Sequence, residues 1–158
     1  MEVARQISIQ TADFDLALEY ERLRIEIGSS VGAIVSFTGL VREQGLLSGS
    51  DEPTQNLRLE HYPGMTEASI EKILIESDLR WNLLGQRVIH RVGDLEPSDQ
   101  IVLVLVASEH RSDAFAACEF IMDYLKTRAV FWKFEGSRDE GKWISSTIND
   151  YDRLAKWS

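Results

Sequence analysis

The order of apolar and polar residues divides the chain into short strands and amphipathic helices. The strongest helical pattern covers residues 111–129, RSDAFAACEFIMDYLKTRA, where apolar side chains recur every three or four positions. This spacing predicts one buried stripe along a helix. The stripe consists of Phe115, Cys118, Met122 and Leu125, with Ala114 and Ile121 beside it.

The longest apolar run, IVLVLVA at residues 101–107, predicts a strand that is covered on both faces and is therefore central. Other strands are expected where β-branched and apolar residues cluster, and other helices where the helical spacing returns. The expected strands are 5–10, 31–43, 57–62, 86–93, 100–108, 130–135 and 142–146, and the expected helices are 15–28, 65–81, 111–129 and a short one within 149–158.

Turn-forming and capping residues punctuate this pattern. Thr11 or Asp13 is expected to cap the first helix, and Gly28 to end it. The Gly, Ser and Pro residues of 44–55 predict a mobile loop, and 136–141 predicts a turn.

Adjacent expected strands are joined by short turns, which favours antiparallel pairing. We therefore predict an α+β fold, with a mostly antiparallel sheet and helices packed on it, rather than a doubly wound parallel sheet. Neither an internal repeat nor a long linker divides the 158 residues, which suffice for one core. We expect one domain over 1–158, with 146–158 as a C-terminal tail.

Composition narrows the possible partners. The formal net charge of −9 repels nucleic acid and anionic membranes, so neither is an expected partner. The single cysteine excludes a disulfide framework and a cysteine-rich zinc site. The first residues hold no apolar signal core, and the 101–107 run is too short to span a bilayer, so we expect a cytoplasmic protein.

Basic residues gather locally on this acidic chain, and the first group is His110 and Arg111 in the segment SEHRSDAF. They fall between the buried strand and a helix that Ser112 can cap. Free N–H groups at a helix start attract anions, and an imidazole and a guanidinium add to that attraction. The segment is therefore either a phosphate or carboxylate site or an ordinary solvated loop.

The second group lies in DYLKTRAVFWKFE, residues 123–135, where Lys126, Arg128 and Lys133 stand among aromatic residues. Lys126 falls on the border of the helical stripe, and Lys133 follows on a strand. A cation near a helix end and a lysine on an exposed strand face are common and need no function. Beside a cleft, however, partial burial and neighbouring cations lower a lysine pKa and give a base or nucleophile.

The remaining candidates carry weaker signals. Arg42 ends a strand and joins a site only if that strand end lies near the His110 loop. Cys118 is expected to be a packed small hydrophobe, not a nucleophile or sulfur carrier. His61 and His90 have no second ligand at metal-binding spacing, so neither a metal nor a cofactor is expected. The sequence has no Walker or dinucleotide glycine motif and no Ser-His-Asp signature.

Taken together, five blocks resemble the family of the large, catalytic subunit of molybdopterin synthase. They span about residues 30 to 146 in the family's order, and HYPGM and DYLKTRAVFWK are the most specific. The blocks are FTGLVRE, LEHYPGMTE, VIHRVGDLEPSDQIV, SEHRSDAFAACEFIMDYLKTRAVFWKFE and KWI.

The resemblance implies an α/β-hammerhead fold and a homodimer. Each protomer binds a small ubiquitin-like sulfur-carrier subunit, which gives a heterotetramer. The carrier's Gly-Gly end bears a thiocarboxylate that enters the large subunit's pocket. Two sulfur transfers then convert cyclic pyranopterin monophosphate (precursor Z) into the dithiolene of molybdopterin, from which the molybdenum cofactor is built.

The resemblance also implies roles for individual residues. Lys126 and Lys133 match the family's two active-site lysines, and the other matches line the pterin and phosphate site, partly across the dimer interface. The chain departs from the family at Phe134, a position that is often basic, so only its backbone remains a ligand contact there. The substrate-site matches are Arg42, His110, Arg111, Lys126, Lys133, Phe134 and Glu135.

We expect Lys126 to carry the proton-transfer or nucleophilic role, Lys133 and Arg42 to stabilise anionic charge, and His110 and Arg111 to hold the phosphate. Two other classes stay open. A non-catalytic module that binds ubiquitin-like tails predicts carrier binding without product. An unrelated phosphate-ester enzyme with His110 as general base predicts activity without a protein sulfur donor.

Overall fold

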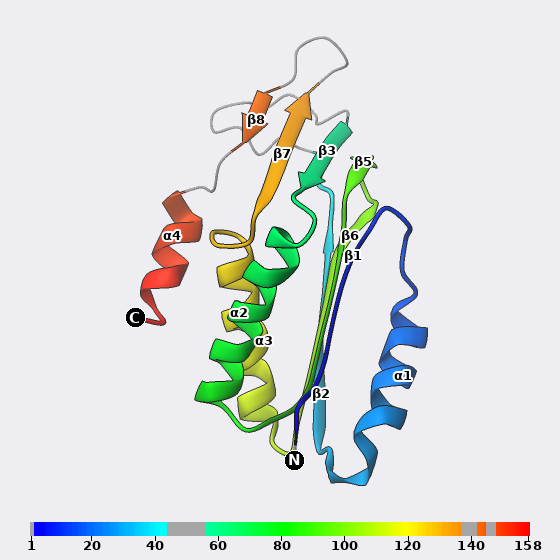
Figure 1. Cartoon of the computed structure of the whole chain (residues 1–158), viewed down its shortest axis with the longest axis vertical. Helices are drawn as coiled ribbons and strands as arrows, with labels where there is room; N and C mark the ends of the chain where they lie inside the picture. The colour runs from blue at the N-terminus through cyan, green and yellow to red at the C-terminus, as the bar shows by residue number, and fades with distance from the viewer. Residues whose placement is uncertain (1, 44–55, 137–141, 145–147) are drawn as a thin grey trace.

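The computed structural model describes residues 2–43, 56–136, 142–144 and 148–158 (Figure 1). The expected mobile loop at 44–55 and most of the expected turn at 136–141 lie outside these residues. The elements in chain order are β1 (Ala4–Gln10), α1 (Leu16–Ile27), the 3-10 turn η1 (Gly28–Ser30), β2 (Ala33–Leu40), β3 (Asn56–His61), α2 (Met65–Arg80), β4 (Leu83–Arg91), β5 (Gly93–Leu95), β6 (Gln100–Ser108), α3 (Arg111–Leu125), β7 (Phe131–Gly136), β8 (Lys142–Ile144) and α4 (Ile148–Ala155).

The main sheet has the strand order β1-β4-β6-β2, so the apolar strand β6 lies inside it as predicted. Strand β1 runs parallel to β4, whereas the β4–β6 and β2–β6 pairs are antiparallel. Helices α2 and α3 cover one face, and α1 covers the other (Figure 1). The α+β prediction is thereby confirmed.

Alternate side chains of β6 enter two different cores, which explains why the run has no polar position. Val102, Val104 and Val106 pack in the cluster under α2 and α3. Leu103, Leu105 and Ala107 pack on the opposite face with Leu23 and Ile27 of α1. All residues of β6 from Val102 to Ser108 are therefore buried, because helices cover both faces of the strand.

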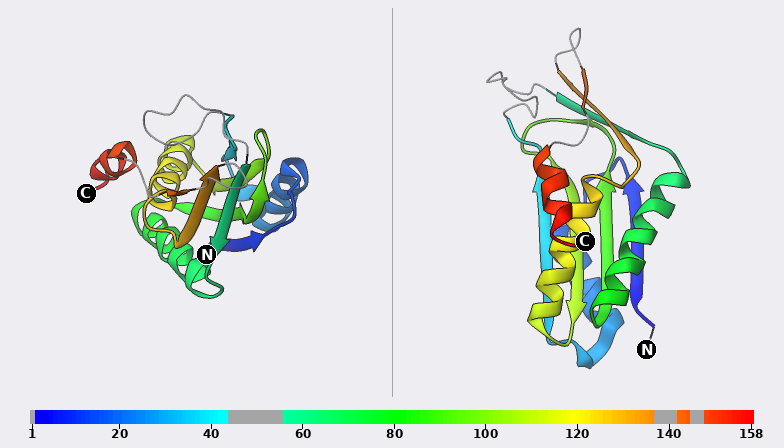
Figure 2. Two further views of the ribbon diagram at one scale, coloured as in Figure 1. Left: turned by 90° about the horizontal axis from the view of Figure 1, so that it is seen from above. Right: turned by 90° about the vertical axis from the view of Figure 1, so that its left-hand side faces the viewer.

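A second sheet of order β5-β3-β7-β8 extends beyond one end of the main sheet (Figure 2, right). Its described pairs are all antiparallel. A third cluster, which includes Leu57, Leu59 and Leu95, fills its junction with the main sheet. The short strand β5 is not predicted as a separate strand, because Gly93 ends the expected strand 86–93 and the next two residues begin the segment DLEPSD, which looks like a turn.

Two predicted helix caps are wrong. Helix α1 is capped by Asp15, whose side chain accepts from the backbone N–H of Leu18 at 3.1 Å. Asp13 instead accepts from the backbone of Phe14 and from the Gln100 side chain, so it joins the turn to β6. Helix α3 begins at Arg111 with His110 as N-cap, two residues before the expected cap Ser112. Gly28 does end α1, with φ of 74°.

The buried face of α3 matches the predicted stripe in part. Four of the six predicted positions are buried, namely Ala114, Cys118, Ile121 and Leu125. Phe115 is 63% exposed, whereas Ala117, Phe120 and Tyr124 are buried. The true buried arc is turned by about one residue step round the helix axis, towards α2 and the C-terminal helix. The apolar spacing alone did not show this, because alanines and aromatic residues allow either side to be buried.

Candidate functional site

Lys126 lies at the end of α3, where it is the C-cap residue. Its backbone N–H donates to the carbonyl of Met122 at 3.2 Å, which closes the last helical turn. Lys126 is exposed at the surface. A lysine at this end of a helix lies in the favourable field of the helix dipole.

A hollow of about 220 Å³ opens beside Lys126. Phe37 enters it from β2, Met122 and Asp123 from α3, and Arg153 from α4. Phe37 and Met122 give it an apolar wall, and its polar lining consists of Lys126 and an ion pair between Arg153 and Asp123. The ammonium of Lys126 beside this apolar wall suits a small ligand with a flat apolar part and an anionic group.

Arg128, the cation between Lys126 and Lys133 in the sequence, does not line this hollow. The guanidinium of Arg128 lies 4.4 Å from the ring centroid of Tyr124. It also lies 3.8 Å from a carboxylate oxygen of Glu76 on α2. Arg128 therefore joins α3 to α2, which is a structural role.

Lys133, Phe134 and Glu135 lie on β7, as the sequence predicts. The backbone of Lys133 pairs with Leu59 of β3 on one side and Ile144 of β8 on the other. Phe134 pairs with Arg58 and Trp143, and Glu135 with Leu57 and Lys142. The side chains of these three residues lie outside what the structure describes, so their roles stay predictions.

His110 and Arg111 are exposed at the opposite end of α3 from Lys126. Fifteen residues at 1.5 Å each separate the two ends of this helix by about 22 Å. Arg42 follows β2, whose first residue Ala33 pairs with Ser108 and whose last residue Leu40 pairs with Gln100. Arg42 thus lies at the end of the sheet away from His110. Within one chain, His110 and Arg111 therefore lie far from both Lys126 and Arg42.

The sequence interpretation missed an anchor beside the hollow, Asp123, which is only 5% exposed on α3. Its carboxylate accepts from Nε of Arg153 and from Nε1 of Trp157, each at 2.7 Å. The carboxylate bonds raise the pKa of the Arg153 guanidinium. The rings of Trp81 and Phe120 meet Trp157 edge-on. Arg153 and Trp157 are one helical turn apart in the sequence, but nothing in the sequence identifies Asp123 as their common acceptor.

The weaker candidates, Cys118, His90 and His61, each contact other residues of the fold. Burial raises the pKa of the Cys118 thiol to about 12, so the thiol is protonated and unreactive at neutral pH, as predicted. His90 is buried, and its ring stacks on Phe131 with centroids 4.0 Å apart. Nε2 of His61 lies 3.8 Å from Glu67. Among the described residues, no three His, Cys, Asp or Glu side chains are grouped as metal ligands would be.

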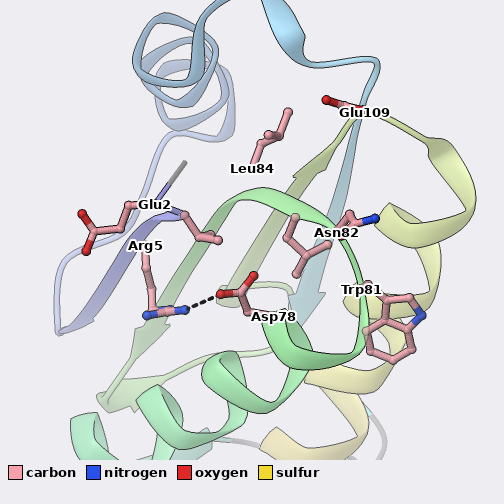
Figure 3. Close-up of a pocket in the computed structure, with 9 residues that line it drawn as sticks. Glu2, Arg5, Asp78, Trp81, Asn82, Leu84 and Glu109 are labelled. Atoms are coloured by element: carbon pink, nitrogen blue, oxygen red, sulfur yellow. Dashed lines mark hydrogen bonds and ion pairs between the residues drawn. The ribbon is translucent and has the colours of Figure 1, made fainter.

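A larger hollow of about 470 Å³ lies at the other end of the main sheet (Figure 3). Arg5 forms an ion pair of 3.5 Å with Asp78 there, and Glu2 and Glu109 are also in its lining. Three carboxylates and a single paired cation make this hollow a poor site for an anion. None of the described helices is both long and apolar enough to cross a membrane.

Comparison with known proteins agrees with the sequence resemblance. A molybdopterin synthase catalytic subunit of Vibrio cholerae serotype O1 is 50% identical over 152 residues, which cover 96% of this chain and 97% of the relative. The catalytic subunit of Ralstonia nicotianae is also 50% identical, over 96% of this chain and 83% of its own.

Solved structures give the same relationship in three dimensions. The molybdopterin biosynthesis MoaE protein of Burkholderia ambifaria has a TM-score of 0.81 and 44% identity, over 99% of this chain and 98% of that one. The molybdopterin synthase structure of Staphylococcus aureus has a TM-score of 0.76 and 32% identity, over 87% and 96%. The model of the MoaE protein family matches residues 9–128. The chain therefore belongs to the MoaE protein family.

Proposed function

We propose that this chain is the catalytic subunit of a molybdopterin synthase. It transfers sulfur from the C-terminal thiocarboxylate of a small ubiquitin-like carrier to precursor Z and so forms the dithiolene of molybdopterin. The observation that carries this proposal is the 50% identity to a catalytic subunit of that name over nearly the whole of both chains. The hollow beside Lys126, with its apolar wall, supports it.

Lys126 is the central residue of the proposed mechanism. Its ammonium or amine group stands at the edge of a hollow in which a carrier tail and a pterin can meet. A positioned amine there transfers a proton or attacks the acyl carbon during sulfur transfer, which contributes roughly 10²–10⁴-fold to rate. Lys133 and Arg42 stabilise the negative charge that develops. At Phe134 the backbone serves as a contact, and Glu135 completes that side of the site.

His110 and Arg111 complete the site from a second copy of the chain. They lie about 22 Å from Lys126 along α3, too far to touch the same small ligand within one chain. The edge strand β2 carries Phe37 and Leu40, which are 40% and 54% exposed, and Phe115 is exposed on the neighbouring α3. A two-fold axis beside this face and perpendicular to α3 makes the two α3 helices antiparallel. The partner's helix start then approaches Lys126.

The sulfur carrier is the second proposed partner, one on each protomer of a heterotetramer. The Helicobacter pylori structure is a complex of subunits 1 and 2 of a molybdopterin-converting factor. At 18% identity and a TM-score of 0.71, it resembles this chain in fold alone. We place the reaction in the cytoplasm.

A single-turnover assay tests the function. Purified protein, thiocarboxylated carrier and precursor Z are mixed, and dithiolene formation is followed by mass. We expect product with the carrier, none without it, and loss of product in Lys126→Ala with the fold and carrier binding kept. Carrier binding without product would instead favour a module that only binds ubiquitin-like tails.

A further inference from the structure

Two hydroxyl groups of α2 hold the segment that joins the two lysines. Thr66 is fully buried, and its Oγ1 donates to the carbonyl oxygen of Val130 at 2.5 Å. Oγ1 of Thr66 also accepts from the backbone N–H of Tyr62 at 3.0 Å. Thr66 therefore uses its one donor and one of its acceptor positions within the protein.

Ser69 completes the arrangement one turn later on α2. Its Oγ accepts from the backbone N–H of Val130 at 3.2 Å and donates to the carbonyl of Thr66 at 2.7 Å. Both backbone polar groups of Val130 are thus bound by side-chain hydroxyls of another element. We call Thr66, Ser69 and the Val130 backbone the hydroxyl clamp.

The clamp lies where the chain passes from helix to strand. Val130 stands four residues after Lys126 and three before Lys133. The next residue, Phe131, begins β7 and pairs with His61, the last residue of β3. Because Thr66 also binds Tyr62, it ties together the ends of both strands of this pair. The direction in which β7 leaves α3 therefore depends on the clamp.

We propose that Thr66 and Ser69 are positioning residues for sulfur transfer. They fix Val130 so that the helix bearing Lys126 and the strand bearing Lys133 keep the relative placement that the reaction needs. This inference rests on the proposed function for the role of the two lysines. Thr66 and Ser69 lie in the segment HYPGMTEAS. This segment then supports the reaction by positioning the lysines, without contact with the substrate.

The same helix offers a matched control. Ser77 is also fully buried, and its Oγ donates to the carbonyl of Leu74 at 2.8 Å and accepts from Gln86 at 2.5 Å. It resembles the clamp hydroxyls in burial and bonding. It lies near the opposite end of α2 and binds a strand of the main sheet, so its loss affects stability alone.

The test compares Thr66→Val, Ser69→Ala, Thr66→Ser and Ser77→Ala in the complete complex. Steady-state sulfur transfer is measured per folded molecule. We expect Thr66→Val and Ser69→Ala to lower kcat by about 10- to 100-fold, because small displacements of reacting groups have effects of this size. KM for both substrates stays within about two-fold, since the substrate contacts remain. Thr66→Ser keeps the hydroxyl and stays close to wild type, and Ser77→Ala keeps its kcat.

Amide hydrogen exchange gives a readout that needs no activity. The Val130 amide is protected in the wild type and in Ser77→Ala, and it exchanges faster in Ser69→Ala. Unchanged protection in Ser69→Ala, or a kcat of Thr66→Val equal to that of Ser77→Ala, overturns the inference. A wild-type complex that makes no dithiolene overturns the proposed function instead, so the two failures are distinguishable.

Discussion

The two ends of helix α3 differ sharply in how they are built. At the C-terminal end, Asp123 binds Arg153 of α4 and Trp157 just after it, and the hydroxyl clamp holds Val130 just beyond Lys126. At the N-terminal end, His110 and Arg111 are exposed next to Glu109. Lys126 is exposed as well, but side chains of α2 and the C-terminal segment bind the residues around it. Among the described residues, by contrast, the only side-chain hydrogen bond at His110 is from its backbone N–H to Ser108 Oγ at 3.3 Å.

This difference indicates how a site can be divided between two chains. Groups that must keep one geometry relative to their own fold are held by buried hydrogen bonds, which are strongly oriented. Groups that serve a neighbouring chain need only be exposed and carried on a rigid helix. Under the proposed function, Lys126 belongs to the first kind, and His110 and Arg111 belong to the second.

The largest effect expected from this division is complementation between two inactive variants. Lys126→Ala and the double change His110→Ala/Arg111→Ala should each reduce turnover by about 10³-fold. After mixing and subunit exchange, half of the dimers are mixed and have one intact site, so about one quarter of the wild-type rate should return. A chain with all three changes serves as the control and recovers nothing. If exchange is shown by mass and no activity returns, the site is not shared.

Two single substitutions of Arg111, at the exposed end, test how this residue contacts the phosphate. Arg111→Ala should raise KM for precursor Z by about 10- to 100-fold, because one charge-assisted contact to the phosphate is lost. Arg111→Lys keeps the charge but not the planar fork, so the rise should be smaller. Melting temperature should not change, since the side chain is exposed. Equal KM values in all three proteins would place the phosphate elsewhere.

At the fixed end, Asp123→Ala should lower the free energy of unfolding by about 2 kcal/mol, because the partly buried N–H of Trp157 and the guanidinium of Arg153 lose their common acceptor. Denaturant unfolding measures this change, and Glu119→Ala is the control. Glu119 also binds Arg153, but at the exposed surface, so its loss should cost less. A free energy of unfolding as high in Asp123→Ala as in Glu119→Ala would mean that Asp123 does not anchor α4.

The smallest effect concerns Cys118, midway between the two ends. Burial raises its pKa from 9.0 to about 12, so above pH 9 the unfolded chain releases a proton that the folded chain keeps. Stability is therefore lost as pH rises, by about 1.4 kcal/mol for each pH unit in this range. The difference in unfolding free energy between wild type and Cys118→Ala, measured at about pH 8 and about pH 10, isolates this effect. A difference that does not change with pH would contradict a buried neutral thiol.

Much of the fold could be predicted from the sequence because it depends on local pattern. The β6 run and the stop at Gly28 appear as predicted, and so does the helix expected over 111–129, except that it ends at Leu125. The predictions that were wrong depend on residues that are distant in the sequence and close in space. Asp15 caps α1 because Asp13 is drawn to Gln100, and α3 buries Tyr124 rather than Phe115 because α2 and α4 lie on that side.

The sequence by itself determined the elements, the class of fold, the family and the residue types that carry the chemistry. Each of these follows from nearest neighbours along the chain or from residues matched in order. Only the tertiary structure decided that Arg128 faces Glu76, that Asp123 anchors the tail, and that α3 separates His110 from Lys126. Those facts depend on where distant segments pack, because a hydrogen bond or an ion pair forms only between groups that the fold brings within a few ångströms of each other.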